Sequence, residues 1–324
     1  MKQPSPAFTR YAWGLLAFLV GVILWGAWVR ISGAGAGCGN HWPTCNGVVL
    51  PIAPNTKTLI EFTHRLTSGL CLPLVLGMMI WAWKLFPKQH AVRKAAALTL
   101  FFLLSEAALG AGLVKFELVA QNTSVARAIT AALHLINTFT LAATSALVAW
   151  WSAHPAPLAW NQNRQAKWPL LLAMAALIVT GMSGAVTALG DTLFPTTIFV
   201  EGGIFARLQE DLSGSTHFLV QLRLIHPILA VGLAFYLLFL SSSLRADHEE
   251  GPRMRLGSLL TTLTICQFLV GFSNILLAAP GLIQIVHLLL AVSIWLTLIL
   301  LLVSVLAEEA ENAGIEKPLA VTSG

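Results

Sequence analysis

The sequence predicts an all-α membrane protein with eight transmembrane helices, arranged as two pseudo-symmetric four-helix bundles. Of its 324 residues, 56% are hydrophobic and only 10% are charged, whereas a soluble domain typically carries about 25% charged residues. The mean hydropathy is +0.77. Too few polar side chains are present to coat a water-soluble globule, so lipid must cover the rest of the surface.

Eight apolar runs are each long enough to cross a hydrocarbon core of about 30 Å, which takes roughly 20 helical residues. Ala279-Pro280-Gly281 separates the last two, and its two helix breakers predict a tight turn. The first run has no convincing cleavage site, so we expect it to span the membrane rather than to be a signal peptide. The runs lie near residues 11–31, 59–83, 95–115, 127–151, 168–188, 218–241, 257–279 and 281–305.

The basic residues predict orientation rather than a nucleic-acid partner, because they lie in short segments between apolar runs. With the N-terminus inside, 12 of the 19 Lys and Arg fall on the inner side. This excess predicts that both termini face the cytoplasm of a bacterial inner membrane, and that two long loops, near residues 32–58 and 189–217, lie outside. The inner residues are Lys2, Arg10, Lys84, Lys88, Arg93, Lys94, Arg164, Lys167, Arg245, Arg253, Arg255 and Lys317. The outer ones are Arg30, Lys57, Arg65, Lys115, Arg127, Arg207 and Arg223.

The eight runs divide into two halves of four, residues 1–152 and 153–324. Each half opens with a helix whose outer end is rich in glycine, Ser32-Gly33-Ala34-Gly35 in one and Gly181-Met182-Ser183-Gly184 in the other. A long outer loop follows in each half, and the second and fourth helices of each half carry a histidine. This pattern predicts a duplicated four-helix bundle.

Four histidines, His64, His134, His226 and His287, lie within predicted spans. At 1.5 Å per residue, all four are about 8–14 Å below the outer helix ends. An intramembrane histidine needs a partner for its polar nitrogens. One alone could be satisfied within the bundle, but four at one depth, two per half, indicate ligands. The other five fall in or beside loops, where solvation is the simpler interpretation: His41, His90, His154, His217 and His248.

The distribution of these four histidines favours haem over zinc. A zinc site would need them to converge at short spacings, whereas one pair per four-helix bundle suits axial ligation of one haem in each half. Glycines on the same helices leave room for a flat macrocycle, although small residues equally serve helix packing. These glycines are Gly69, Gly77, Gly110, Gly112, Gly232 and Gly271.

Arginines near the outer ends are candidates to pair with haem propionates. Arg127 shares a helical face with His134, and Arg223 shares one with His226. Arg30 is a third candidate. All three could instead be ordinary interfacial anchors.

Glu61 stands three residues before His64, so both project from one face of the second helix. The carboxylate could simply be favoured by the helix dipole, or it could act as a base beside a metal ligand. The position three before His226 is Arg223, so the halves are chemically unequal. This difference predicts one reacting site and one supporting site. Glu106 is a weaker candidate for a buried carboxylate.

Cys38 and Cys45 lie in the first outer loop, on the oxidising side of the membrane, which predicts a short-loop disulfide. A metal site that includes His41 is the alternative, although it lacks a fourth ligand. Cys71 and Cys266 lie within helices and are expected to be buried as small hydrophobes.

These residues resemble those of bacterial haem A synthase. The resemblance rests on eight helices in two halves, the run Glu61-Phe62-Thr63-His64-Arg65, three further histidines in helices, and a cysteine pair around Trp42-Pro43. It covers nearly the whole chain. The loop departs from the commoner family pattern at Gly39-Asn40-His41. The family oxidises the C8 methyl of haem O to the formyl group of haem A, for terminal oxidase assembly.

The resemblance implies that His226 and His287 are the axial ligands of a haem b that carries electrons in the C-terminal half. It implies that His64 and His134 face the substrate haem O, with Glu61 as the essential acid, and that both sites lie toward the periplasm. The disulfide loop would close a lid or exchange electrons or thiols with a partner. Haem O synthase would deliver the substrate, oxidase assembly factors would receive the product, and a homo-oligomer is compatible with this arrangement.

Two other functions stay open at the level of sequence. A di-haem electron-transfer protein of the cytochrome b type would need ligand pairs at two depths, whereas all four histidines lie near one face. A haem carrier or chaperone without turnover gives no reason for a carboxylate beside His64.

Overall fold

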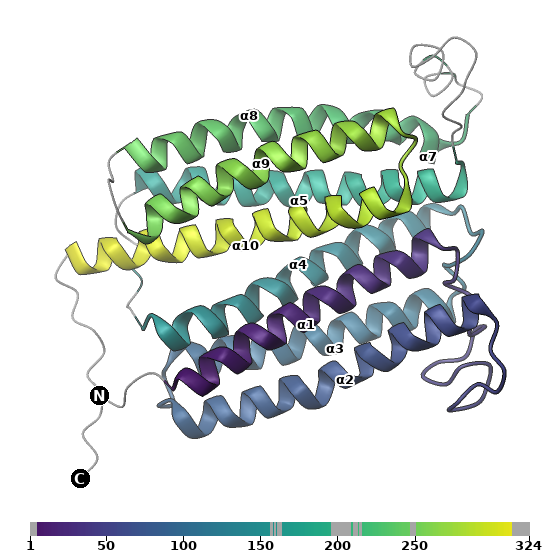
Figure 1. Cartoon of the computed structure of the whole chain (residues 1–324), viewed down its shortest axis with the longest axis horizontal. Helices are drawn as coiled ribbons and strands as arrows, with labels where there is room; N and C mark the ends of the chain where they lie inside the picture. Colours follow the sequence, from purple (N-terminus) through teal and green to yellow (C-terminus); the bar gives the residue numbers. More distant parts are fainter. Residues whose placement is uncertain are drawn as a thin grey trace.

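The chain folds into long helices that run side by side along the longest axis of the molecule (Figure 1). The computed structural model describes residues 5–155, 164–195, 216–246 and 251–312, with a few single residues between these ranges. Within them, eight helices are long and apolar enough to cross a membrane. The predictions of an all-α fold and of eight spans are therefore confirmed.

The long helices extend past most of the predicted apolar runs because polar residues cap them. Ser5, Asn55 and Ser124 each accept a hydrogen bond from a backbone N–H of the first helical turn, which stabilises the start of α1, α2 and α4. The helices are α1 Pro6–Ile31, α2 Thr56–Leu85, α3 Ala91–Lys115, α4 Val125–Ala153, α5 Arg164–Leu193, α7 Phe218–Gln221, α8 Ile225–Ala246, α9 Pro252–Leu276 and α10 Gly281–Asn312.

The sixth predicted span differs from a continuous helix. A 3-10 turn, Leu222–Leu224, separates α7 from α8. Pro227 has no N–H to donate to the carbonyl of Arg223, and its ring crowds that carbonyl, so the α-helical bonding pattern is interrupted there. As a result His226 lies in the first turn of α8.

Each half of the chain is a closed ring of four neighbouring helices. In the first half α1 and α3 each contact both α2 and α4, and in the second half α5 and α9 each contact both α8 and α10. The two histidine-bearing helices of a half therefore lie across its bundle from one another. Helices α1 and α4 contact α5 and α10 to join the halves. The pseudo-symmetry of the halves and the domain boundary after residue 152 stay predictions.

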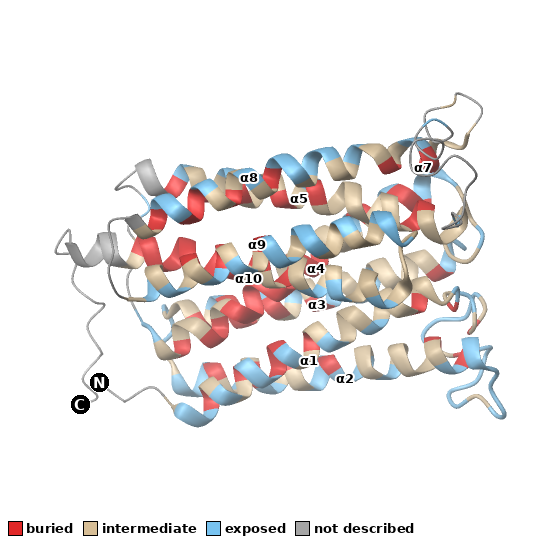
Figure 2. Cartoon of the chain, turned by 45° about the horizontal axis from the view of Figure 1, so that its top comes forward, coloured by how far each residue is buried: buried red, intermediate tan, exposed pale blue. Residues whose placement is uncertain are grey.

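Tight packing is concentrated in the halves of the helices that lie away from the 32–55 loop (Figure 2). In α10, no residue from 281 to 291 is buried, whereas most residues from Val292 to Leu306 are. Two apolar clusters form this core, one around Phe8, Val75 and Met78, the other around Leu237 and Leu298. The four intramembrane histidines all lie in the opposite, less tightly packed helix halves.

Helices α4 and α10 are the central ones. In their most apolar segments 61% and 67% of the residues are buried, against at most 28% in each of the other six spans. Small side chains such as Ala142, Ala146 and Ala149 let α4 approach its neighbours closely. Each of these two enclosed helices carries one histidine of a predicted pair.

Some sequence predictions fall outside the described residues. These include His248, most of the second long outer loop, and three of the charges used for orientation, Lys2, Arg207 and Lys317.

The burial pattern predicts that α10 stabilises the bundle through its second half. Leu298→Ala removes a fully buried side chain and should lower the free energy of unfolding by about 2–5 kcal/mol. Leu282→Ala, at a position on the same helix that is 72% exposed, should change it by no more than about 0.5 kcal/mol. Unfolding of the purified protein in mixed detergent micelles measures both values, and equal effects would contradict this description of the core.

Candidate functional site

His226 and His287 face one another across the second bundle. Their ring centroids are 6.2 Å apart and the ring planes are nearly perpendicular, at 87°. Two imidazoles on opposite sides of one metal ion, each bound through a nitrogen at about 2 Å, have centroids about 6 Å apart. The spacing therefore fits a single metal ion between the two rings.

The polar atoms of these two rings are satisfied unequally. Nδ1 of His226 lies 3.1 Å from the Thr180 carbonyl and 3.2 Å from the Ser183 hydroxyl, both on α5. Nδ1 of His287 is buried without a hydrogen-bond partner, while its Nε2 lies 3.3 Å from the side-chain amide of Gln267. Because an unpaired polar atom costs free energy in an apolar interior, His287 is a side chain whose nitrogen needs a ligand.

Glycines on neighbouring helices make room for three of the four histidine rings. A Cβ added at Gly26 or at Gly184 would lie 2.8 Å from Cε1 of His64 or His226, respectively. A Cβ at Gly271 would lie 3.0 Å from Cε1 of His287. These close approaches explain why glycine is used at these positions. Gly26 was not singled out from the sequence.

In the first bundle both imidazoles have an unsatisfied nitrogen. His64 on α2 and His134 on α4 each have a buried Nδ1 without a geometrically acceptable hydrogen bond, although Nδ1 of His134 lies 3.3 Å from a carboxylate oxygen of Glu106. Three observations fit a haem in each bundle. Ring nitrogens are unsatisfied, glycines lie against three of the rings, and the helix halves around the rings are loosely packed. Zinc is less well supported, since no group of three or more His, Cys, Asp or Glu side chains within the described ranges could hold a metal ion.

The arginines expected near the propionates are held by protein groups at the end of the bundles that lies toward the 32–55 loop. Arg223 donates to the Gly190 carbonyl at 2.7 Å and to the Phe194 carbonyl, and its Nε lies 3.0 Å from Asp191. Arg127 donates to the carbonyls of Ala120 and Asn122. Propionate binding by either arginine stays a prediction, and Asp191 was not recognised from the sequence.

Arg30 joins the two halves of the protein. From α1 it donates to the Ala188 carbonyl at 2.6 Å and to Thr192 at 2.7 Å, both on α5, and to Gln284 of α10 at 3.1 Å. Its guanidinium is thus part of the contact between the bundles.

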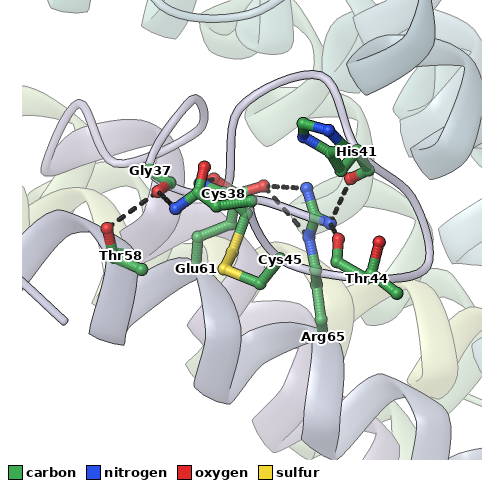
Figure 3. A network of polar contacts seen from close by, with 9 residues as sticks. Gly37, Cys38, His41, Thr44, Cys45, Thr58, Glu61 and Arg65 are labelled. Atoms are coloured by element: carbon green, nitrogen blue, oxygen red, sulfur yellow. Dashed lines mark hydrogen bonds and ion pairs between the residues drawn. A yellow bond between two sulfur atoms is a disulfide. The ribbon is translucent and has the colours of Figure 1, made fainter. Parts of the chain in front are cut away.

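Glu61 links α2 to the disulfide loop (Figure 3). Its carboxylate accepts a hydrogen bond from the Cys38 backbone N–H at 2.9 Å and pairs with Arg65 at 2.5 Å. Arg65 also donates to the carbonyls of His41 and Thr44 at 2.6 and 2.7 Å. The Glu61 side chain is therefore enclosed, with the residue 3% exposed, between the start of α2 and the loop. The pair was not predicted from the sequence, although the i,i+4 spacing of Glu61 and Arg65 is a signal that could have indicated it.

The predicted disulfide between Cys38 and Cys45 is confirmed. Because both sulfurs are in this bond, they are not available to the alternative metal site with His41. Cys71 is buried, as predicted, but Cys266 is exposed on α9, so the prediction of burial was wrong for it. An apolar thiol within a membrane span can face lipid as readily as protein, and the sequence does not distinguish the two.

Comparison with known proteins places these features in a family. The family model for the cytochrome oxidase assembly protein COX15-CtaA matches residues 9–299. A "Protoheme IX farnesyltransferase" of Thermus thermophilus is 46% identical over 312 residues, which are 95% of this chain and 50% of that protein. A "Heme A synthase" of Shouchella clausii is 41% identical over 95 residues, which are 29% of this chain and 32% of that protein.

A "Heme A synthase" of Halalkalibacterium halodurans is 39% identical over 98 residues, 30% of this chain and 33% of that protein. The chain thus spans about half the length of the Thermus relative, and it matches about a third of each of these two heme A synthases.

The disulfide predicts a specific order of thiol reactivity. In membranes, Cys38 and Cys45 should resist a water-soluble alkylating reagent until a reductant is added. Cys71 and Cys266 should need detergent or denaturant, because protein covers the first and lipid the second. Mass spectrometry of the alkylated peptides measures this, and labelling of Cys38 before reduction would show that the bond is not stably formed.

Proposed function

Because the chain belongs to the cytochrome oxidase assembly protein family COX15-CtaA, we propose that it is a haem A synthase. In this proposal it oxidises the C8 methyl of haem O to a formyl group by way of a hydroxylated intermediate, taking the oxygen atom from water and releasing four protons and four electrons, the electrons going to an external acceptor. The spacing of His226 and His287 is the observation that most supports haem chemistry in the bundle. The similarity to heme A synthases over 29% and 30% of this chain adds to this support.

The C-terminal bundle is proposed to hold a haem b between His226 and His287. His226 and His287 would hold the group, which would supply electron transfer. Thr180 and Ser183 fix the His226 ring, and Gly184 and Gly271 let the two rings lie against α5 and α9. Thr180 and Ser183 orient the His226 imidazole, and Gln267 contacts that of His287.

The N-terminal bundle is proposed to bind the substrate haem O between His64 and His134. Glu61 is the proposed proton acceptor for the hydrogens that leave the methyl group. It stands one helical turn from His64, and its carboxylate contacts the outer loop. Protons accepted by Glu61 would have a short route to the outer surface. The loop held by Glu61 and Arg65 would cover this end of the bundle.

The membrane setting follows from the same proposal. Eight apolar helices and the excess of basic residues on one side support an inner-membrane protein with both termini in the cytoplasm. The haem sites would then face the periplasm.

The Thermus relative is named for farnesyl transfer to protohaem. Because haem O is a farnesylated haem, we infer that an enzyme of that activity supplies the substrate, and that oxidase assembly factors take the product.

The ligand assignment predicts a spectroscopic result. His226→Ala or His287→Ala should each remove the low-spin signal of the haem b retained on purification, because each opens one axial position. His217→Ala, which changes a histidine beside the outer loop, is the matched control and should keep the signal. Optical spectra of the purified variants measure this. A full low-spin signal in both bundle variants would exclude the C-terminal ligand pair.

The role of Glu61 predicts a change in product. Glu61→Gln keeps the shape of the side chain but removes the base, and loss of a general base typically costs about 10²–10⁴ in rate. Cells with this variant should accumulate haem O or the hydroxylated haem, while the purified protein keeps its haem b spectrum. Chromatography of extracted haems measures the product.

A control separates the chemical role of Glu61 from its role as a loop anchor. Thr58→Val removes another contact between α2 and the loop, the hydrogen bond to the Gly37 carbonyl, but keeps the carboxylate. It should leave haem A as the main product. A normal haem A yield from Glu61→Gln would remove this residue from the mechanism, and equal losses in both variants would assign Glu61 to the loop alone.

A further inference from the structure

A second carboxylate lies in the first bundle, on α3. One oxygen of Glu106 accepts a hydrogen bond from Thr138 at 2.5 Å, and the other accepts one from the Asn137 amide at 2.6 Å. That second oxygen also lies 3.3 Å from Nδ1 of His134. The proposed function above gives this carboxylate no task.

The surrounding contacts fix the position of Glu106. The Asn137 amide also donates to the Phe102 carbonyl at 2.9 Å, and the Asn137 oxygen accepts from Ser105 at 2.8 Å. These two contacts define which way the amide points, so its N–H faces Glu106. A carboxylate in an apolar bundle is costly unless it is hydrogen-bonded, and here two donors hold it against the histidine.

The second bundle has an amide where the first has this carboxylate. Glu106 stands four residues before Gly110 on the third helix of its half, and Gln267 stands four residues before Gly271 on the third helix of the other. Gln267 lies 3.3 Å from Nε2 of His287, the histidine of the fourth helix, whereas Glu106 faces Nδ1 of His134. In each half the third helix thus presents a polar side chain to the histidine of the fourth, charged in one half and neutral in the other.

We propose that Glu106 is a positioning residue that holds the Nδ1 side of His134, leaves Nε2 for the iron of the haem in the first bundle, and makes this ligand more electron-donating than His287. The proposal rests on the proposed function, since it takes His134 as an axial ligand. A carboxylate on the far nitrogen of a metal-bound imidazole fixes its tautomer and raises its basicity. The neutral amide of Gln267 adds no such charge.

The proposal implies that the haems of the two bundles have different reduction potentials. An electron-donating ligand stabilises ferric iron, so the haem at His64 and His134 would be harder to reduce than it would be with a neutral partner at Glu106. The unequal third helices therefore give the two sites different tasks, one supporting oxidation of a bound haem and the other accepting and passing on electrons.

A redox titration tests this proposal, with haem b as the probe in both sites of the purified protein. The wild type should show two one-electron waves, and His134→Ala should remove one of them. Glu106→Gln should move that same wave to higher potential, by at least about a tenfold change in the ferric-to-ferrous ratio at fixed potential, and leave the other wave in place. Gln267→Glu should lower the wave that His287→Ala removes.

Thr138→Val is the structural control, because it removes one hydrogen bond to Glu106 but leaves the carboxylate beside His134. It should shift the wave much less than Glu106→Gln does. An unchanged wave in Glu106→Gln, or an equal shift in Thr138→Val, would overturn the role of Glu106 while the ligand assignment stands. If both waves remain in His134→Ala, the ligand assignment and the role of Glu106 are both overturned.

Discussion

An imidazole inside a bilayer has two ring nitrogens that need partners, and no water is present to supply them. This protein places four such rings at one level of its membrane-spanning helices. In three of them Nδ1 is buried without a hydrogen bond of acceptable geometry. Most of the unusual features of the fold lie around these rings. Glycines stand where three of the rings meet the next helix. Packing is looser in the helix halves that carry the rings.

The helices are consequently divided along their length. The helix halves that lie away from the 32–55 loop form a tightly packed apolar core, which stabilises the bundles. The helix halves nearer that loop hold the four histidines, the arginines and the three carboxylates discussed above, those of Glu61, Glu106 and Asp191. The disulfide loop is attached at this end through Glu61 and Arg65. A core at one end can hold the helices in place while the other end accommodates a large ligand.

The sequence predicted the elements well because long apolar runs need only local information. Eight spans, the break between the last two near Ala279-Pro280-Gly281 and the disulfide all follow from composition and spacing. Pro227 marks a possible interruption before His226, but a proline alone does not predict one, since α2 and α5 continue through Pro73 and Pro169. Contacts between distant segments could not be predicted. Glu61 was recognised as unusual, yet its bond to Cys38 depends on how a loop of more than 20 residues folds back.

Glu106 shows the same limit more clearly. Its partner His134 is 28 residues away on the next helix, and no spacing rule within one helix connects them. The central positions of α4 and α10 could not be predicted from the sequence either. A span that faces protein and one that faces lipid can be equally apolar. The sequence does contain the unequal pair, since Glu106 and Gln267 each stand four residues before a glycine. Its importance can be recognised only from the structure, which places each of the two side chains beside a histidine.

The central claim is that the first bundle alters a haem and the second only assists it. The most direct measurement is the haem content of a host that makes haem O but no haem A, with this chain present in wild-type form, with His134→Ala, or absent. We expect haem A in the first strain alone, with haem O in the other two and the haem b of the second bundle retained in His134→Ala. Haem O unchanged in the wild-type strain, with both bundles binding haem, would contradict the claim and identify a haem carrier instead.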